Sequence, residues 1–450
     1  MSADLLLSPI LLAIFYGTLR IFTRKKWVNW IEVLSIGFLT AYVLYSQHFT
    51  TFVVGGWSSA IGVELKYDSN SFWFILSLLV VWGSVKIRFE KWDQVMESLA
   101  DYLFATLYAL FISNDLFNIY VTIELASVVS FLMIGHGDKP SRIWAALKYM
   151  FLSSIAFGFY LFGTVLIYYE NGVISIGALQ NEKLSAFALT FIVVALLVKS
   201  GIFGLSAWMI DVYSMADTPV SMLLSGTTVN AGLFAIVRIY PLLPEKLKEF
   251  VMGVGIFSAC AGAIYAIFDD KVKRTLAFST TSQMGVAVSL LSLSPTATSL
   301  YAFAHSNAKA LLFSKNGRIS TLIGSLSLIG LPPLAGYFAK VYFEKSFPLL
   351  SSFLLFLTSI YVVKLFKNLK WRFSPFELLL ESALFSFIFF KPFGNAFSVS
   401  KVLVIASVGI LVGIFFEKKI SLPHLKDVFG LEEGIAYQLW ALVVMLIVII

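Results

Sequence analysis

Cysteine and histidine are the residues that this sequence has least of. Its 450 residues include a single cysteine, Cys260, and four histidines. One cysteine excludes a disulfide framework, a cysteine-ligated zinc site and an iron–sulfur cluster held by this chain alone. Four histidines leave little room for a haem or a histidine-rich metal site. We therefore expect no cofactor and no metal in this chain, and any redox chemistry must take place in another chain.

Charged residues are also scarce. They make up 13% of the chain and hydrophobic residues 59%, whereas soluble domains average about 25% charged residues. This composition indicates a protein of the lipid bilayer. An aromatic content of 16% excludes a disordered or collagen-like chain. The net charge of +7 does not indicate nucleic-acid binding, because no soluble module carries a basic face and membrane proteins retain Lys and Arg in cytoplasmic loops.

The common motifs of soluble enzymes are missing as well. The sequence contains no GxGxxG, Walker A, HExxH or GxSxG pattern. The connections between apolar runs are short, so no extramembrane domain is left to hold a nucleotide or a soluble substrate. We therefore expect a chain without catalytic chemistry of its own.

Long apolar runs dominate what is present, and they predict an all-α polytopic membrane protein. A helix needs about 20 apolar residues to cross the hydrocarbon layer. The sequence predicts about 14 to 16 such transmembrane helices, with approximate spans at 5–22, 30–46, 71–86, 99–113, 116–135, 147–169, 186–210, 219–240, 249–268, 275–293, 297–313, 320–343, 347–366, 376–390, 400–416 and 435–450.

Loop charges give an independent prediction of orientation. Positive loops follow alternate spans, beginning with Arg24, Lys25 and Lys26 after the first. Because positive loops stay inside the cell, this alternation predicts a multi-pass protein of the cell membrane with both termini outside. One inside connection breaks the pattern, since it carries Asp211 and Asp217 and no cation. That exception indicates a re-entrant or functional loop.

Two ionisable residues stand inside apolar runs in the first half of the chain. Glu124 shares a helix face with Tyr120 and Ser127, and Lys199 ends the apolar stretch 191–198 just before two glycines. Buried charges are costly and mark ion pathways more often than packing, and broken helices at mid-membrane are where transporters place ion sites. A Glu124–Lys199 pair would titrate jointly. The alternatives are a carboxylate paired for packing and a lysine that reaches the membrane surface.

The second half of the chain carries a similar set. His305 and Lys309 stand four residues apart on one helix face, and Lys340 follows the segment GLPPLAG at 330–336, where two prolines must interrupt the helix. As alternatives, His305 could bond to a neighbouring backbone, Lys309 could reach the surface, and Glu344 could pair with Lys340 for packing.

The spacing of these features predicts an internal repeat. We divide the chain into N-terminal helices (1–98), a first five-helix repeat (99–240), a second (249–370) and C-terminal helices (371–450). Each repeat contains one broken helix, which is the pattern of inverted-repeat transporters. An odd number of helices per repeat places two consecutive copies in opposite orientations.

Taken together, several segments resemble a known family. It comprises the antiporter-like, proton-translocating membrane subunits shared by respiratory complex I, membrane-bound hydrogenases and Mrp-type sodium/proton antiporters. The resemblance covers roughly residues 99–370 and rests on the glutamate helix 115–135, the Lys148–Tyr149 pair, KSGIFGLSAW at 199–208, TPVSMLLSG at 218–226, VKRTLAFSTTSQMG at 272–285, His305 with KALLF at 309–313, and SLIGLPPLAGYFAK ending at Lys340.

The resemblance implies a proton path built from two half-channels. Glu124 with Lys199 would serve one side of the membrane and Lys340 the other, with Lys309 linking them and Lys148, Asn230 and His305 supporting the path. The implied partners are other integral membrane subunits of the same complex, further antiporter-like subunits among them, together with the lipid bilayer. The transported ion would be the proton, with sodium as the alternative.

One departure from the family pattern keeps other functions open. Asn230 stands where the family has a central lysine, and an amide cannot carry a proton as a cation, so the relay would need water or Lys309 directly. An architectural antiporter-like subunit with impaired conduction is therefore one alternative. A stand-alone secondary transporter is the other.

Overall fold

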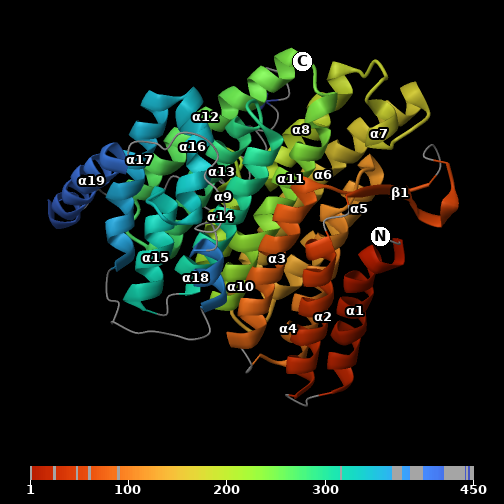
Figure 1. Cartoon of the computed structure of the whole chain (residues 1–450), viewed down its shortest axis with the longest axis horizontal. Coiled ribbons are helices and arrows are strands. Elements are labelled where there is room, and N and C mark those ends of the chain that lie inside the picture. The colour runs from red at the N-terminus through yellow and green to blue at the C-terminus, as the bar shows by residue number, and fades with distance from the viewer. Residues whose placement is uncertain are drawn as a thin grey trace. The chain divides into compact units, whose positions relative to one another are not determined.

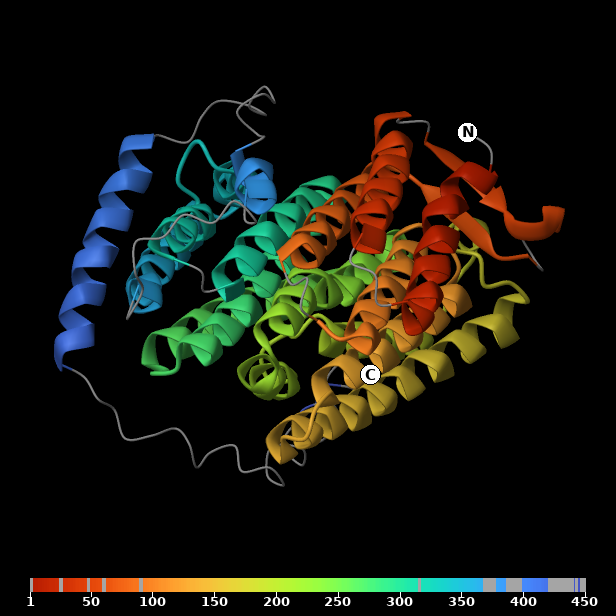
Figure 2. The same ribbon diagram turned by 90° about the horizontal axis from the view of Figure 1, so that it is seen from below.

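The computed structural model describes residues 3–23, 27–46, 49–58, 62–88, 92–314, 317–366, 378–385, 399–419, 441 and 444–445. These residues form two compact units, shown in two views in Figures 1 and 2. The described parts of Met1–Ser200, Thr227–Phe250 and Trp440–Ile450 form the first, and those of Gly201–Gly226 and Val251–Leu439 form the second. The predicted span 435–450, apart from 441 and 444–445, and the positive loops at 24–26 and 367–372 lie outside the described residues.

Helices build almost all of the first unit. Its elements are α1 (Ala3–Phe22), α2 (Trp27–Ser46), β1 (Thr50–Val53), β2 (Glu64–Tyr67), α3 (Ser69–Arg88), α4 (Gln94–Phe111), α5 (Leu116–Gly135), α6 (Pro140–Asn171), the short α7 (Ile176–Leu179), α8 (Ala186–Lys199) and α11 (Val229–Ile239). Local sequence sets the helix ends. The Asp93 and Asp115 side chains accept hydrogen bonds at the starts of α4 and α5, and Gly172 ends α6 in the left-handed conformation.

The second unit is helical throughout its described residues. Its elements are α9 (Ala207–Met215), α10 (Thr218–Leu223), most of α12 (Glu245–Phe268), α13 (Val272–Leu290), α14 (Pro295–Ser314), α15 (Arg318–Ile329), α16 (Ala335–Ser346), α17 (Pro348–Val362), α18 (Leu378–Phe385) and α19 (Val399–Lys419). Helix α14 packs against α10, α13, α15, α16 and α18. It is therefore central to this unit, and the site residues that it carries are buried.

Close helix packing depends on glycine at two positions near the site residues. A Cβ atom at Gly163 of α6 would lie 2.5 Å from the Ala188 carbonyl oxygen of α8, and one at Gly232 of α11 would lie 2.7 Å from the Ser200 backbone nitrogen. Both distances are shorter than atoms can approach without displacement. Only glycine lets α6 and α11 come this close to α8, whose last residue is Lys199.

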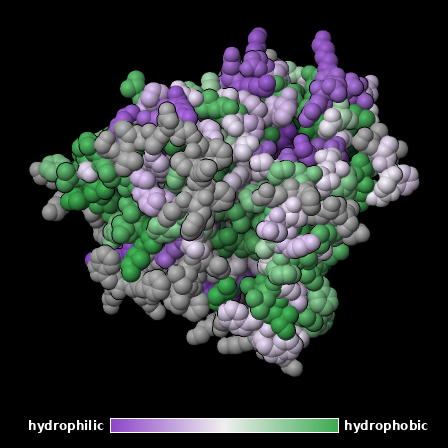
Figure 3. Space-filling view, in the orientation of Figure 1, coloured by the Kyte–Doolittle hydropathy of each residue, from purple (hydrophilic) through white to green (hydrophobic). Residues whose placement is uncertain are grey.

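The helices have the character of membrane spans. Within the described ranges, eight helices are long and apolar enough to cross a bilayer, which confirms the predicted multi-pass helical class. Large hydrophobic side chains such as Leu34 and Phe38 of α2 are exposed, and hydrophobic residues lie among paler ones on the visible surface over α1 and α2 in Figure 3. Lipid can cover such faces, whereas a soluble protein rarely exposes large apolar patches.

The two predicted breaks are present, and two further features were not predicted. The run 186–210 is divided into α8 and α9, and the run 320–343 into α15 and α16. The run 219–240 contains a π-helical turn at Leu224–Thr228, which sequence reasoning missed. It also missed the antiparallel hairpin in which Thr50 pairs with Tyr67 and Val53 with Glu64, because strands of four residues between apolar runs give little periodicity.

Candidate functional site

Lys199 is buried at the broken end of α8. Its ammonium donates hydrogen bonds of 2.6 Å to the Ser127 hydroxyl oxygen of α5 and of 2.6 Å to the Tyr149 hydroxyl oxygen of α6. The nitrogen also lies 4.8 Å from the centre of the Tyr149 ring, within the range of a cation–π interaction. The residue is 2% exposed. All of these partners of the ammonium are uncharged.

The sequence after Lys199 explains why the helix ends there. Gly201 and Gly204 adopt φ angles of +68° and +87°, a left-handed conformation that suits glycine and ends an α-helix. The break leaves Lys199 in the last turn of α8, where the negative end of the helix dipole stabilises a cation. The glycines singled out in the sequence therefore produce the expected interruption.

Glu124 lies one turn before Ser127 on α5. It is partly exposed, and one of its carboxylate oxygens is buried with no hydrogen-bond partner. Among the described residues, Glu124 and Lys199 form no direct ion pair; the lysine instead contacts Ser127 of the Glu124 helix. The Ser153 hydroxyl of α6 donates to the Ser127 oxygen at 3.3 Å. Hydroxyl groups of α5 and α6 thus surround the ammonium.

Two supporting residues are buried in the same unit. Lys148 is 3% exposed and precedes Tyr149 on α6, and Asn230 is fully buried on α11. Gly232, two residues after Asn230, is the position at which α11 packs against Ser200 at the end of α8. The Asn230 helix therefore lies directly against the end of the Lys199 helix.

Arg238, farther along α11, has a different environment. Its guanidinium donates to the Asp68 carboxylate at 2.5 Å, to the Lys66 carbonyl oxygen at 2.7 Å and to the Ser71 hydroxyl oxygen at 2.7 Å. Burial alone would raise the pKa of Asp68, but Arg238, the Ser71 backbone N–H and Lys66 outweigh it and hold that pKa below its usual value. These contacts join α11 to the start of α3.

In the second unit, Lys309 and His305 occupy the buried face of α14. The Lys309 ammonium donates to the Leu276 carbonyl oxygen of α13 at 2.9 Å, and the residue is fully buried. His305 is 3% exposed, and neither of its ring nitrogens has a hydrogen-bond partner. A buried imidazole with both nitrogens unsatisfied is costly, so its position requires an explanation other than packing.

Lys340 binds the end of the other broken helix. Its ammonium donates to the carbonyl oxygens of Leu328 at 2.6 Å and Ile329 at 3.1 Å, in the last turn of α15. Gly330, with a φ angle of +92°, ends that helix. Glu344, the alternative partner of Lys340, instead forms an ion pair of 3.0 Å with Lys401. Lys340 is therefore held by neutral carbonyl groups that the interruption leaves free.

His305 and Lys340 line one small cavity. The other polar lining residues are Gln283, Tyr301 and Ser327, and the volume open to water centres is about 10 Å³, which is close to what one water molecule needs. The Tyr301 hydroxyl donates to the Gln283 side-chain oxygen. The structure thus brings together a lysine and a histidine that are 35 residues apart in the sequence and places room for water beside them.

The structure adds partners that sequence reasoning did not assign. Tyr149 contacts Lys199 directly, although the sequence pointed to it only as the neighbour of Lys148. Gln283 and Tyr301 line the Lys340 cavity. Gln283 lies in the segment 272–285 that carries the family resemblance, but sequence reasoning gave it no role, and nothing in the local sequence marks Tyr301. Asp211, expected in an acidic connection, lies within α9, whereas Asp217 stands immediately before α10.

Comparison with protein families identifies a match in the middle of the chain. Residues 113–321 match the family described as NADH:quinone oxidoreductase/Mrp antiporter, TM. The matched segment contains Glu124, Lys148, Lys199, Asn230, His305 and Lys309, whereas Lys340 follows it.

Curated proteins with similar sequences include quinone oxidoreductase subunits. The chain is 27% identical over 343 residues to NADH-quinone oxidoreductase subunit N of Desulforudis audaxviator, an alignment that covers 65% of this chain and 68% of the relative. It is 26% identical over 366 residues to NAD(P)H-quinone oxidoreductase subunit 2 of a Nostoc species, covering 71% and 70%.

Solved structures share the fold. A chain of the membrane-bound sulfane sulfur reductase, an archaeal respiratory membrane complex, aligns with a TM-score of 0.72 over 100% of this chain and 99% of its own length, at 18% identity. A chain of the Mrp complex from a Dietzia species aligns with a TM-score of 0.79 over 98% of this chain and 60% of its own length, also at 18% identity.

Proposed function

We propose that this chain is an antiporter-like membrane subunit, which its match over residues 113–321 to the NADH:quinone oxidoreductase/Mrp antiporter family supports, and that the lysines at its two helix breaks carry the translocated proton. One observation supports the proposal above all. Lys199 is buried in the last turn of α8, and the partly buried Lys340 of α16 binds the last turn of α15; both ammonium groups are bound by uncharged oxygens. Such sites fit a lysine that gains and loses a proton during turnover.

The chemistry follows from the partners. A lysine paired with a carboxylate is stabilised as a cation, whereas one that is desolvated among hydroxyl and carbonyl groups has little to retain its proton when a nearby charge changes. Glu124 supplies such a charge on the helix of Ser127. A rearrangement that brought its carboxylate to Lys199 would stabilise the ammonium, and the reverse movement would release the proton.

The proposed route has an entry site, a relay and an exit site. Glu124 and Lys199 serve one side of the membrane with Lys148 beside them, and Lys340 serves the other. The relay is supported by Asn230, Lys309 and His305. At Asn230, where the family has a central lysine, water carries the proton. The water-sized cavity between His305 and Lys340 supports the last step, because a water molecule there could hydrogen-bond with the imidazole and the ammonium.

The architecture that fits this route is a pair of inverted repeats. Residues 99–240 and 249–370 would each supply five of the chain's 14 to 16 transmembrane helices, with one broken helix in each. The two lysines at the breaks would then be related by the repeat. The chain would lie in the cell membrane with both termini outside, beside other integral membrane subunits, further antiporter-like ones among them, and any oxidoreduction would take place in those partners.

Replacement of the first lysine tests this function. We expect Lys199→Ala in the assembled membrane complex to abolish proton pumping per substrate turnover in closed vesicles while assembly stays normal. Lys183→Ala is the matched control, because Lys183 is exposed in a loop. Undiminished pumping of protons and of sodium by Lys199→Ala would discard the conducting role.

An architectural role is the second candidate, and Asn230 favours it because an amide replaces the central lysine. In that case the double variant Glu124→Gln with Lys199→Met should leave coupling intact, whereas each single change should harm assembly because the two opposite charges on neighbouring helices would no longer balance. A double variant that assembles but does not pump would exclude the architectural role.

A further inference from the structure

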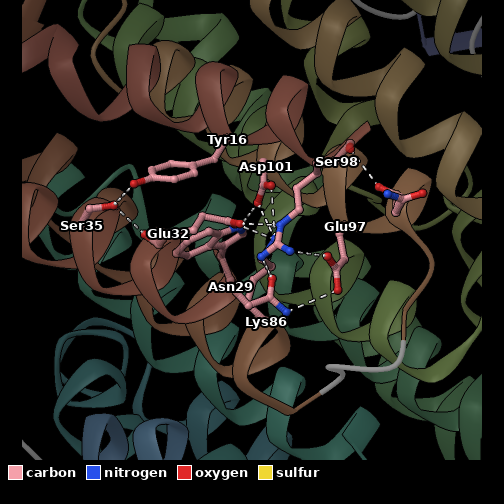
Figure 4. Close-up of polar contacts among 11 residues, drawn as sticks. Tyr16, Asn29, Glu32, Ser35, Lys86, Glu97, Ser98 and Asp101 are labelled. Atoms are coloured by element: carbon pink, nitrogen blue, oxygen red, sulfur yellow. Dashed lines mark hydrogen bonds and ion pairs between the residues drawn. The ribbon is translucent and has the colours of Figure 1, made fainter. Parts of the chain in front are cut away.

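A second group of buried charges contains none of the residues of the proposed proton route and lies at one end of the four N-terminal helices (Figure 4). It is contributed by α1, α2, α3 and α4. We call it the N-terminal charge cluster, and its members are Arg20, Asn29, Glu32, Lys86, Glu97 and Asp101.

Each cation of the cluster bridges two carboxylates. Lys86 lies 2.6 Å from a Glu32 oxygen and 2.9 Å from an Asp101 oxygen. Arg20 lies 3.0 Å from the other Glu32 oxygen and 3.3 Å from a Glu97 oxygen. Glu32 therefore binds both cations, while Glu97 and Asp101 bind one each.

Further hydrogen bonds surround the two outer carboxylates. The Trp82 indole N–H donates to Asp101 at 3.3 Å, and the Asn29 amide donates to Glu97 at 3.3 Å. Four of the five charged side chains are at most 2% exposed, and Glu97 is 10% exposed. Glu97 is therefore the member nearest to solvent.

The charge count of the cluster does not balance. Three carboxylates, Glu32, Glu97 and Asp101, face two cations, Arg20 and Lys86. With every group ionised, one negative charge would remain in excess at a site with almost no access to water, which is energetically unfavourable. When two carboxylates share one site, one of them retains a proton. Glu32 and Asp101, which share Lys86, are the pair that meets this condition.

The helix ends reinforce this arrangement. Arg20 and Lys86 lie in the last turns of α1 and α3, and Glu97 lies in the first turn of α4. Helix dipoles stabilise cations at C-terminal ends and carboxylates at N-terminal ends. The positive-inside pattern predicts that this end of the helices faces the cell interior, so a proton could enter past Glu97.

We propose that the N-terminal charge cluster is a proton-binding site that holds one exchangeable proton between Glu32 and Asp101. The proton comes from water at the Glu97 end and makes the cluster neutral. Its release leaves one negative charge among the four helices. Within the described residues no three metal-ligating side chains converge into a metal site, so a proton is the cation that this cluster fits.

Charged groups on the neighbouring elements do not supply the missing positive charge. Helix α4 also packs against α5 and α11, and α3 against α11 and β2. The charged residues of these elements are Glu124, Arg238, Glu64 and Lys66, and among the described contacts none of them forms a hydrogen bond or ion pair with the carboxylates of the cluster. Arg88, at the end of α3, stands two residues after Lys86 and therefore on a different face of that helix.

Infrared spectroscopy of the purified full-length protein in its complex tests the proposal. At neutral pH the wild type should show a protonated-carboxyl C=O band that shifts when H₂O is exchanged for D₂O. Asp101→Asn and Glu32→Gln each leave two carboxylates for two cations, so each should lose this band. Glu182→Gln is the matched control, because Glu182 is exposed, and it should keep the band.

A third variant tests the charge count itself. Lys86→Met leaves three carboxylates for one cation, so neutrality requires a second proton and the band should grow about two-fold. The proposal is overturned if the band is unchanged in both Asp101→Asn and Glu32→Gln, or if it does not respond to D₂O. The infrared band does not depend on pumping. Evidence against proton transport by the lysines would therefore not refute the N-terminal proton site, and a missing infrared band would not refute proton transport by the lysines.

Discussion

The Lys199 ammonium and the Tyr149 hydroxyl oxygen are 2.6 Å apart, and the same ammonium lies 4.8 Å from the centre of the tyrosine ring. A single tyrosine of α6 therefore contacts the lysine of α8 in two ways. The hydroxyl accepts a charge-assisted hydrogen bond, and the ring provides its negative face. Tyr149 thus positions the amine in place of a carboxylate.

The Tyr149 hydroxyl can be removed without removing the ring. A hydrogen bond to a charged group contributes about 1.5–3 kcal/mol, so we expect Tyr149→Phe to lower proton pumping about tenfold or more, because the ammonium loses one of its two hydroxyl partners. Pumping per turnover in closed vesicles is the measurement. Tyr168→Phe, on an exposed position of the same helix, is the control. Equal pumping by Tyr149→Phe and the wild type would show that the hydroxyl is dispensable.

The α15–α16 break depends on a glycine that can be tested by stability. A Cβ atom at Gly336 would overlap the Ser327 carbonyl oxygen, so Gly336→Ala should lower the free energy of unfolding by about 1–3 kcal/mol. Gly158 of α6 has open space at the corresponding position, so Gly158→Ala should be neutral or stabilising by up to about 1 kcal/mol. Thermal unfolding of both variants in detergent measures the difference. Two indistinguishable midpoints would refute the packing argument.

Asp115 predicts a pH dependence of stability. Burial raises the pKa of this carboxyl to about 6; hydrogen bonds from the backbone N–H groups of Asn118 and Phe117 oppose the shift and Glu64 adds to it. Because the folded-state pKa lies above the unfolded one, the stability contributed by Asp115 is complete below pH about 4 and is lost as the pH rises through about 6.

The variant Asp115→Asn isolates that contribution. Asparagine keeps the cap at the start of α5 but cannot ionise, so at pH 8 the variant should be more stable than the wild type, and the difference should shrink toward pH 4. Unfolding midpoints across this pH range measure it, with Glu182→Gln as a control that should follow the wild type. A difference that is constant with pH would contradict the assignment.

Much of the fold could be predicted from sequence, because apolar length alone marks membrane spans. The two interruptions were also predictable, since Gly201 and the two prolines at 332–333 cannot continue a regular helix in hydrocarbon. The hairpin at 50–67 and the π-helical turn at Leu224–Thr228 were not, because they depend on tertiary packing and leave no periodic pattern.

The candidate site was predictable only where the buried charge itself identifies the residue. Lys199, Lys309 and Lys340 were identified because an amine in an apolar run demands a partner. Their actual partners are a serine, a tyrosine and backbone carbonyl groups. Such neutral groups occur throughout the sequence, so only the three-dimensional arrangement distinguishes Tyr149 from the other tyrosines.

The central claim is that the lysines at the two helix breaks carry the translocated proton, and proton pumping by Lys340→Met tests it most directly. Lys345→Met, exposed on the same helix, is the matched control. In an assembled complex with normal substrate turnover, the account predicts that Lys340→Met loses pumping in closed vesicles while Lys345→Met retains it. Wild-type pumping by a fully assembled Lys340→Met complex would contradict the account.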